Sequence, residues 1–140
     1  MSFRGNNGIS TQENHVATPQ KILNDIMKLL FSTQIINKLY HLNTTSFARH
    51  KASDAFDDSI LSHIDKFAET YIGRYKVKPQ ITLLKLETSY LTDDGIKEML
   101  ADLKKYLESY NTMFNDNDLL NIGDELLADI NKTLYLFNLN

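Results

Sequence analysis

Residues 47–75, FARHKASDAFDDSILSHIDKFAETYIGRY, form a long segment in which apolar side chains recur at steps of three and four residues. This spacing is typical of one face of an α-helix. The stripe consists of Phe56, Ile60, Ile64, Phe67, Tyr71 and Tyr75. Ser46 stands directly before the segment, where a serine can cap the first turn. The segment therefore predicts one long helix with a single buried face.

Three further segments show the same periodicity, at residues 19–41, 92–110 and 115–137. Thr18 and Pro19 open the first, since threonine caps helices and proline is tolerated at the first helical position. A short polar break, residues 43–46, separates it from the segment at 47–75. Residues 76–91 contain Pro79 and the β-leaning run 80–84, and we interpret them as a long connection with at most one helical turn.

The unequal lengths of the connections predict the topology. A short turn makes the first two helices antiparallel, whereas a long connection can cross the bundle, which an ordinary up-and-down bundle does not need. We therefore expect an all-α protein, with a ferritin-like four-helix bundle over residues 18–140 and a long crossover between the second and third helices. Residues 1–17 are polar and show no periodicity, so they are predicted to form a flexible N-terminal arm.

Composition excludes several classes of function. The chain of 140 residues contains no cysteine, which excludes disulfides, thiolate zinc sites and cysteine nucleophiles. Its net charge is −3, and Arg4 is the only Lys or Arg of the arm, so DNA binding should be weak or absent. No apolar run approaches the ~20 residues that span a bilayer, and the first fifteen residues lack the apolar core of a signal peptide. These features fit a cytoplasmic protein.

The ionisable side chains of residues 47–75 share one stripe. At about 100° per residue, Asp54, Asp65, Asp58 and Glu69 lie within about 100° of His50 around the helix. Apolar Leu61, Ala68 and Ile72 lie in or beside this stripe. Two interpretations remain open: a solvated acidic face, and an interface that carries a metal site. His63 lies about 220° from His50 and is interpreted as a satisfied core residue, and His15 as part of the arm.

Several motifs together resemble one family. Tyr40-His41-Leu42-Asn43, Ser46-Phe47, His50-x-x-x-Asp54, Asp65-x-x-x-Glu69 and the run 124–137 are similar to the mini-ferritins known as Dps. The resemblance implies iron ligands, with His41, Asp65 and Glu69 from one subunit and His50 and Asp54 from its neighbour. It implies a mono- or di-iron site that oxidises Fe(II) within a hollow homo-oligomer. The Glu-x-x-His motif of intra-bundle di-iron sites is absent.

The positions of these residues suit a two-fold axis. Asp54 and Asp65 are equidistant from a centre between Ser59 and Ile60, and His50 and Glu69 share that centre. If two copies of this helix pack antiparallel, pairing is reciprocal. Asp54 of one copy then faces Asp65 of the other.

A second resemblance supports an alternative function. Residues 67–79 are similar to small proteins of large DNA viruses and phages, some of which share the Dps-like pattern. The alternative is a non-catalytic structural or interaction protein that keeps the bundle, located in the host cytoplasm or in a virion.

Overall fold

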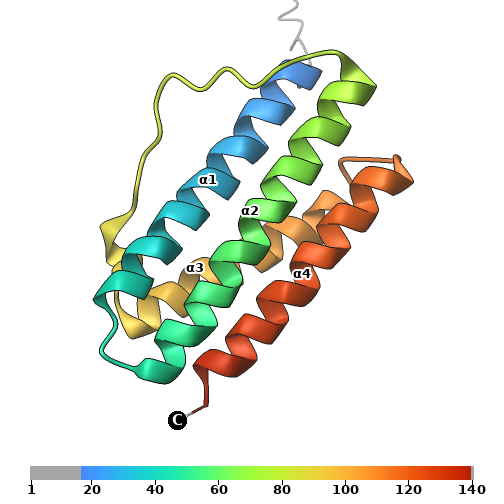
Figure 1. The fold of residues 1–140 in the computed structure, drawn as a ribbon. Helices are drawn as coiled ribbons and strands as arrows, with labels where there is room; N and C mark the ends of the chain where they lie inside the picture. The colour runs from blue at the N-terminus through green and yellow to red at the C-terminus, as the bar shows by residue number, and fades with distance from the viewer. Residues whose placement is uncertain (1–16, 140) are drawn as a thin grey trace, which may run out of the picture.

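The computed structural model describes residues 17–139, in which four α-helices form a bundle without any β-strand (Figure 1). The helices are α1 (Pro19–Asn43), α2 (Phe47–Tyr75), α3 (Asp93–Tyr110) and α4 (Asn117–Phe137), and a short 3₁₀ turn, η1, covers Thr88–Leu91. None of these helices is long and apolar enough to span a membrane. The predicted all-α four-helix bundle is confirmed. All but the last residue of the predicted arm lies outside the described range.

Side-chain caps set the helix ends close to their predicted positions. Thr18 accepts a hydrogen bond from the backbone N–H of Lys21 at 3.2 Å, and Ser46 accepts one from Arg49 at 3.2 Å. Each of these bonds satisfies a backbone donor that the first turn of a helix leaves free. At the other end of α2, Lys76 adopts the left-handed conformation, with φ of 57°, and this ends the helix.

The connection between α2 and α3 runs back along α1. Near the start of α1, Gln20 donates to the backbone carbonyl of Lys78 at 2.6 Å, and Asn24 accepts from the N–H of Gln80 at 2.8 Å. The connection then descends the length of the bundle and ends in η1, beside the start of α3 (Figure 1). As a result, α2 and α3 run in the same direction, and α1 and α4 run in the opposite one.

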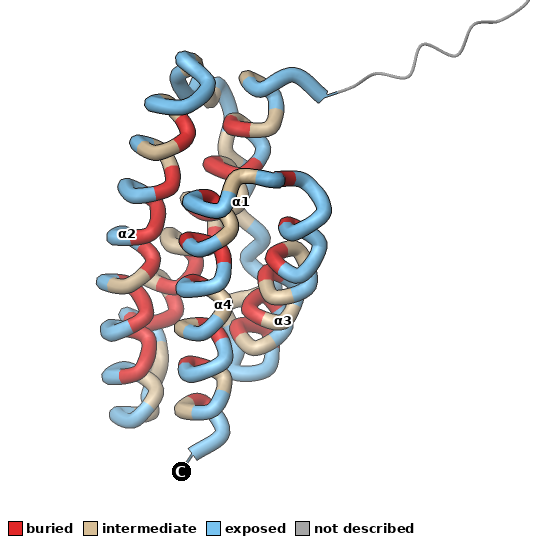
Figure 2. Tube along the Cα trace, turned by 90° about the vertical axis from the view of Figure 1, so that its right-hand side faces the viewer, coloured by how far each residue is buried: buried red, intermediate tan, exposed pale blue. Residues whose placement is uncertain are grey.

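The core lies between the inward faces of all four helices, and Figure 2 shows buried positions following one side of α2. The predicted stripe of α2 is buried except for its last member, Tyr75, which lies at the end of the helix. In α4, Leu126, Ile130 and Phe137 are buried in the core. The largest buried aromatic cluster comprises Phe67, Tyr71, Tyr110 and Phe114.

Arg49 ties the four helices together at the end of the bundle where α2 begins. Its guanidinium donates to the hydroxyl of Tyr40 on α1 at 3.0 Å and to the carbonyl of Asp93 on α3 at 3.0 Å. It also lies 5.3 Å from the ring centroid of Phe137 on α4. Because Arg49 is one residue before His50, this network fixes the position of the first turn of α2.

Two helical glycines give a matched test of the packing. A Cβ atom at Gly123 would lie 2.9 Å from the buried ring of Tyr110, whereas one at Gly73 would have no neighbour within 4 Å. We expect Gly123→Ala to destabilise the protein by about 1–3 kcal/mol through overpacking. Gly73→Ala should stabilise it by about 0.5–1 kcal/mol, because alanine loses less entropy in a helix. Urea denaturation measures both, and a Gly123→Ala protein as stable as the parent would contradict this packing.

Candidate metal centre

His41 and His50 face each other across the turn between α1 and α2. Their rings stack with centroids 3.9 Å apart and an interplanar angle of 21°. The Nδ1 atom of His41 lies 2.9 Å from the backbone carbonyl oxygen of His50, and Nδ1 of His50 lies 3.0 Å from the carbonyl oxygen of His41. The two hydrogen bonds are therefore reciprocal, and each imidazole is held by the backbone of the other residue.

This arrangement determines which ring nitrogens are available to a ligand. A carbonyl oxygen only accepts hydrogen bonds, so Nδ1 of each imidazole must carry the proton. In a neutral imidazole the lone pair then resides on Nε2. Histidines that bind metals commonly donate their other ring N–H to a backbone carbonyl, which fixes the orientation of the ring. Both histidines thus have the tautomer in which the lone pair of Nε2 is free to accept.

Ser53 and Asn37 support His41 from inside the bundle. The hydroxyl of Ser53 lies 3.2 Å from Nδ1 of His41 and donates to the carbonyl of Arg49 at 2.7 Å. Asn37, buried one turn before His41, donates to the carbonyl of Ser53 at 2.9 Å. Sequence analysis did not identify Ser53, although its position three residues after His50 places it on a neighbouring part of the helix surface.

Asp54 is an acidic group beside the imidazole of His41. Its Oδ1 atom lies 3.9 Å from Nε2 of His41, and its side chain is 60% exposed. That separation is too long for a hydrogen bond. It suits two ligands of one ion, because ligands at roughly 2.0–2.2 Å from a shared metal lie about 3–4 Å apart. Within one chain, the structure therefore places Asp54 beside His41, and His41 stacks on His50.

Asp65 and Glu69 lie on the same helix but far from this cluster. Both side chains are exposed. Asp65 follows His50 by fifteen residues, which corresponds to about 22 Å along the helix axis. The structure thus corrects the implied grouping of His41 with Asp65 and Glu69 of the same chain. The physical reason is the short turn at residues 44–46, which holds the end of α1 against the start of α2.

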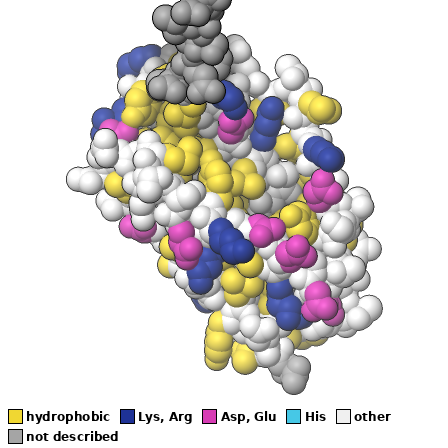
Figure 3. Space-filling model, turned by 180° about the vertical axis from the view of Figure 1, so that it is seen from behind, with side chains coloured by type: hydrophobic (Ala, Val, Ile, Leu, Met, Phe, Trp, Pro, Cys, Tyr) yellow, Lys and Arg dark blue, Asp and Glu magenta, His cyan; other side chains and the backbone are white. Residues whose placement is uncertain are grey.

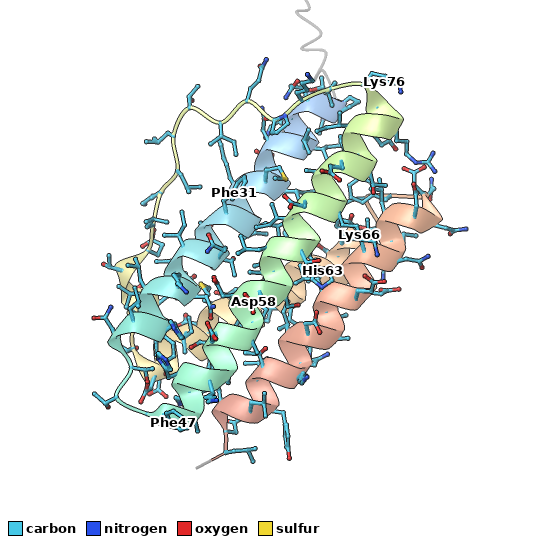
Figure 4. All side chains as sticks on the ribbon, in the orientation of Figure 1. Phe31, Phe47, Asp58, His63, Lys66 and Lys76 are labelled. Carbon is cyan, nitrogen blue, oxygen red and sulfur yellow. The ribbon has the colours of Figure 1, made fainter. Side chains whose placement is uncertain are left out.

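One outward-facing strip of α2 carries Asp54, Asp58, Asp65 and Glu69, and we call these four residues the acidic face. Figure 4 shows Asp58 on the front of α2, whereas His63 is directed toward α4. All four side chains are exposed. Leu61 lies among them with 42% of its surface exposed. Within residues 17–139 of a single chain, no group of three or more His, Asp or Glu side chains is close enough to hold a metal ion.

The remaining described histidine has a structural role, as predicted. His63 is buried, and its Nε2 atom lies 2.8 Å from a carboxylate oxygen of Asp129 on α4. The hydroxyl of Ser59 donates to the same carboxylate. Burial acts to raise the pKa of Asp129, but the hydrogen bonds from Ser59 and His63 outweigh burial and lower the pKa. This group joins α2 to α4.

The lowered pKa of Asp129 predicts a pH-dependent contribution to stability. A carboxyl whose pKa is lower in the folded state stabilises the fold above its unfolded pKa, about 3.9, and loses this effect as the pH falls through the folded value. Asp129→Asn should therefore be less stable than the parent at pH 7, and the difference should shrink below about pH 4. Thermal denaturation across this range measures it, with the exposed Asp124→Asn as control. A constant difference would contradict the prediction.

The tautomers of His41 and His50 can be tested by ¹⁵N NMR of the imidazole nitrogens. We expect both neutral rings to carry the proton on Nδ1, because each Nδ1 faces a carbonyl oxygen. Ser53→Ala should leave His50 unchanged and increase the mobility of the His41 ring. Protonation of both rings on Nε2 would contradict the reciprocal hydrogen bonds.

A family model matches residues 41–137, and the family it describes is a family of unknown function, DUF5856. The matched range begins at His41 and includes α2, α3 and α4. No curated protein and no solved structure matches the chain. Because the match covers more than half of the sequence, the chain belongs to the DUF5856 family.

Proposed function

We propose that the protein is a Dps-like mini-ferritin, which binds and oxidises Fe(II) at sites shared by two subunits and sequesters iron in a homo-oligomer. The observation that carries the proposal is the pair of imidazoles. His41 and His50 each direct Nδ1 to a backbone carbonyl, and Asp54 lies 3.9 Å from Nε2 of His41. Backbone carbonyls that hold both rings in this tautomer prepare Nε2 for a cation.

The course of the chain supports a ferritin-like topology. A four-helix bundle with one long crossover is the arrangement of ferritin-like proteins, and residues 76–91 run the length of this bundle. One cavity inside the bundle, by contrast, offers little room for a metal ion. The cavity among α1, α2, α3 and α4 has a volume of about 20 Å³, and apart from His63 and two tyrosines its walls are apolar. This favours a site at the surface of α2.

A second copy would supply the missing ligands. With α2 paired antiparallel about the centre between Ser59 and Ile60, Asp65 and Glu69 of one copy approach Asp54 and His50 of the other. Each of the two identical sites would then contain His41, His50 and Asp54 from one subunit and Asp65 and Glu69 from its partner. This division differs from the one that the sequence resemblance implies, and it keeps all five candidate ligands.

The chemistry of this donor set suits iron as a substrate. Imidazole nitrogen and carboxylate oxygen are both ligands of Fe(II), and a site with open positions admits an oxidant. With hydrogen peroxide as the oxidant, two Fe(II) ions each give one electron to the same peroxide molecule. This molecule takes up two protons and leaves as two water molecules. The protein residues hold the ions, and the carboxylates offset the positive charge that increases on oxidation.

One observation favours the alternative of a non-catalytic interaction protein, in a cell or in a virion. Leu42 and Phe47 flank the turn beside the imidazoles and are 67% and 73% exposed. Large exposed apolar side chains are common where another protein binds. In that case the bundle would persist and Fe(II) oxidation would be absent.

The double substitution Asp65→Ala and Glu69→Ala separates these functions. If the shared site oxidises iron, this variant should lose Fe(II) oxidation, followed by absorbance, while its helical circular dichroism stays that of the parent. Glu108→Ala with Asp124→Ala, two exposed carboxylates on α3 and α4, is the matched control and should oxidise iron normally. Unchanged oxidation in the Asp65→Ala, Glu69→Ala protein would eliminate the proposed site.

Anomalous scattering at the iron edge, from crystals grown with Fe(II), gives a direct check. We expect a peak beside Nε2 of His41 and the carboxylate of Asp54. A peak at other residues, or none at this position, would contradict the proposal.

A further inference from the structure

A cavity lies beneath the long connection, where η1 and α3 meet α1. Its volume is about 270 Å³, and the residues that line it belong to α1, to the connection with η1, and to α3. At about 30 Å³ for each water molecule, this volume would hold roughly nine waters. The cavity is therefore large enough for a small organic molecule, and it is separate from the candidate metal centre at the turn between α1 and α2.

The walls of this cavity are mainly apolar. The aliphatic and aromatic side chains that line it are those of Leu29, Ile36, Tyr90, Met99, Leu103 and Tyr106. Ligand sites in proteins are typically concave and mostly apolar, with a few polar groups that orient the ligand. An aliphatic or aromatic molecular body therefore gains free energy when it leaves water for this space.

One buried hydroxyl of the lining has no partner. Thr33 is only 2% exposed, and because it lines the cavity, the little surface that it keeps lies there. Among residues 17–139, its hydroxyl forms no hydrogen bond. The hydroxyl of Thr133, by contrast, donates to the carbonyl one turn before it at 2.8 Å. Because a buried hydroxyl without a partner costs free energy, Thr33 indicates that a polar atom belongs in the buried part of this cavity.

Carboxylates stand at the exposed rim of the cavity. Glu87 and Asp102 are exposed and line it, and the hydroxyl of Tyr90 donates to Asp102 at 3.2 Å. Burial raises the pKa of Tyr90, and the carboxylates of Asp102, Glu98 and Glu87 raise it further. The charges that act on this hydroxyl at the rim are therefore negative.

Two lysines lie near this rim and neutralise it only in part. Lys85 lines the cavity and pairs with Glu87 at 3.2 Å, but its side chain is 83% exposed. Exposed Lys105 follows Asp102 by three residues on α3. Seen from behind, charged side chains of both signs likewise surround exposed hydrophobic ones (Figure 3). The carboxylates of Glu87, Asp102 and Glu98 outnumber the two lysines by one, so the rim favours a cationic group.

We propose that this cavity binds a small organic monoamine, whose apolar or aromatic body fills the space between α1 and α3. The ammonium group lies at the rim beside Glu87 and Asp102, where the ring of a tyrosine also attracts a cation. A hydroxyl at the other end of the ligand bonds to Thr33. A second ammonium group there would be buried without a carboxylate, which disfavours diamines. The inference is independent of the proposed iron chemistry, because no candidate metal ligand lines this cavity.

Isothermal titration calorimetry of the full chain with tyramine tests this inference, because tyramine carries an ammonium group, an aromatic ring and a phenol hydroxyl. We expect one molecule to bind per chain with a dissociation constant of about 0.1–1 mM, an affinity that about ten non-hydrogen atoms can supply. Absence of tyramine binding would overturn the inference.

The anion 4-hydroxyphenylpropionate, in which a carboxylate replaces the ammonium group, is the matched control and should bind at least about tenfold more weakly. Lys28 and Lys85 line an adjoining hollow, where an anion would be attracted instead. Binding of this anion as tight as that of tyramine would therefore contradict the assignment of an amine.

Thr33→Val tests the buried hydroxyl. Phenethylamine lacks the phenol hydroxyl of tyramine, so this substitution should weaken tyramine binding about three- to tenfold and leave phenethylamine binding unchanged. The melting temperature of the ligand-free variant should not fall, because the substitution removes a buried hydroxyl that has no partner. Equal effects on the two amines would refute the contact with Thr33 and with it the inference.

Charge substitutions at the rim test the position of the ammonium group. Glu87→Gln with Asp102→Asn should weaken the binding of both amines at least about tenfold, since charge-assisted hydrogen bonds are lost. Glu108→Gln with Asp124→Asn makes the same charge changes on exposed parts of α3 and α4 and should leave both affinities unchanged. Equal affinities in the two double variants would overturn the inference. Tyramine binding that weakens as the protein concentration rises would also overturn it, and would identify a second copy of the chain as the occupant.

Discussion

The short turn at residues 44–46 is the constraint on which the site depends. It leaves the last turn of α1 directly against the first turn of α2, so His41 and His50 meet and each binds the other's backbone carbonyl. Arg49 then joins this end of the bundle to α3 and α4. A longer turn would allow the two helix ends to separate, and the imidazoles would lose the hydrogen bonds that select their tautomer.

Helix α2 carries two kinds of surface along its whole length. Its inward side holds Phe56, Ile60 and Ile64 in the core, and His63 and Ser59 bind Asp129 of α4. Its outward side makes few contacts within the chain. Because stability comes from the first surface, the carboxylates of the second can be changed without loss of the bundle. This separation is what makes substitutions of the acidic face informative about function rather than folding.

The helices could be predicted from the sequence because periodicity and caps are local. Thr18, Ser46 and Lys76 end or begin helices within a few residues of the expected positions, and a single turn, η1, does occur in the long connection. Other features depend on contacts distant in sequence. The bond between Ser59 and Asp129 joins residues seventy positions apart, and no local pattern specifies it. In α4, Leu119 and Ile122 are buried because packing against α3 sets the rotation of the helix.

Prediction of the candidate site from the sequence is limited in the same way, because part of the site depends on contacts that no local pattern specifies. Spacing along one helix identifies His50, Asp54, Asp65 and Glu69, but the partner of His41 depends on how tightly the chain turns before α2. The turn places His41 beside Asp54. The proposed site therefore takes these two ligands from the same subunit and keeps the same set of five. The proposed site has an energetic consequence. In it, one subunit offers His41, His50 and Asp54 and the partner offers Asp65 and Glu69, so neither half alone would have enough donors to hold a cation strongly.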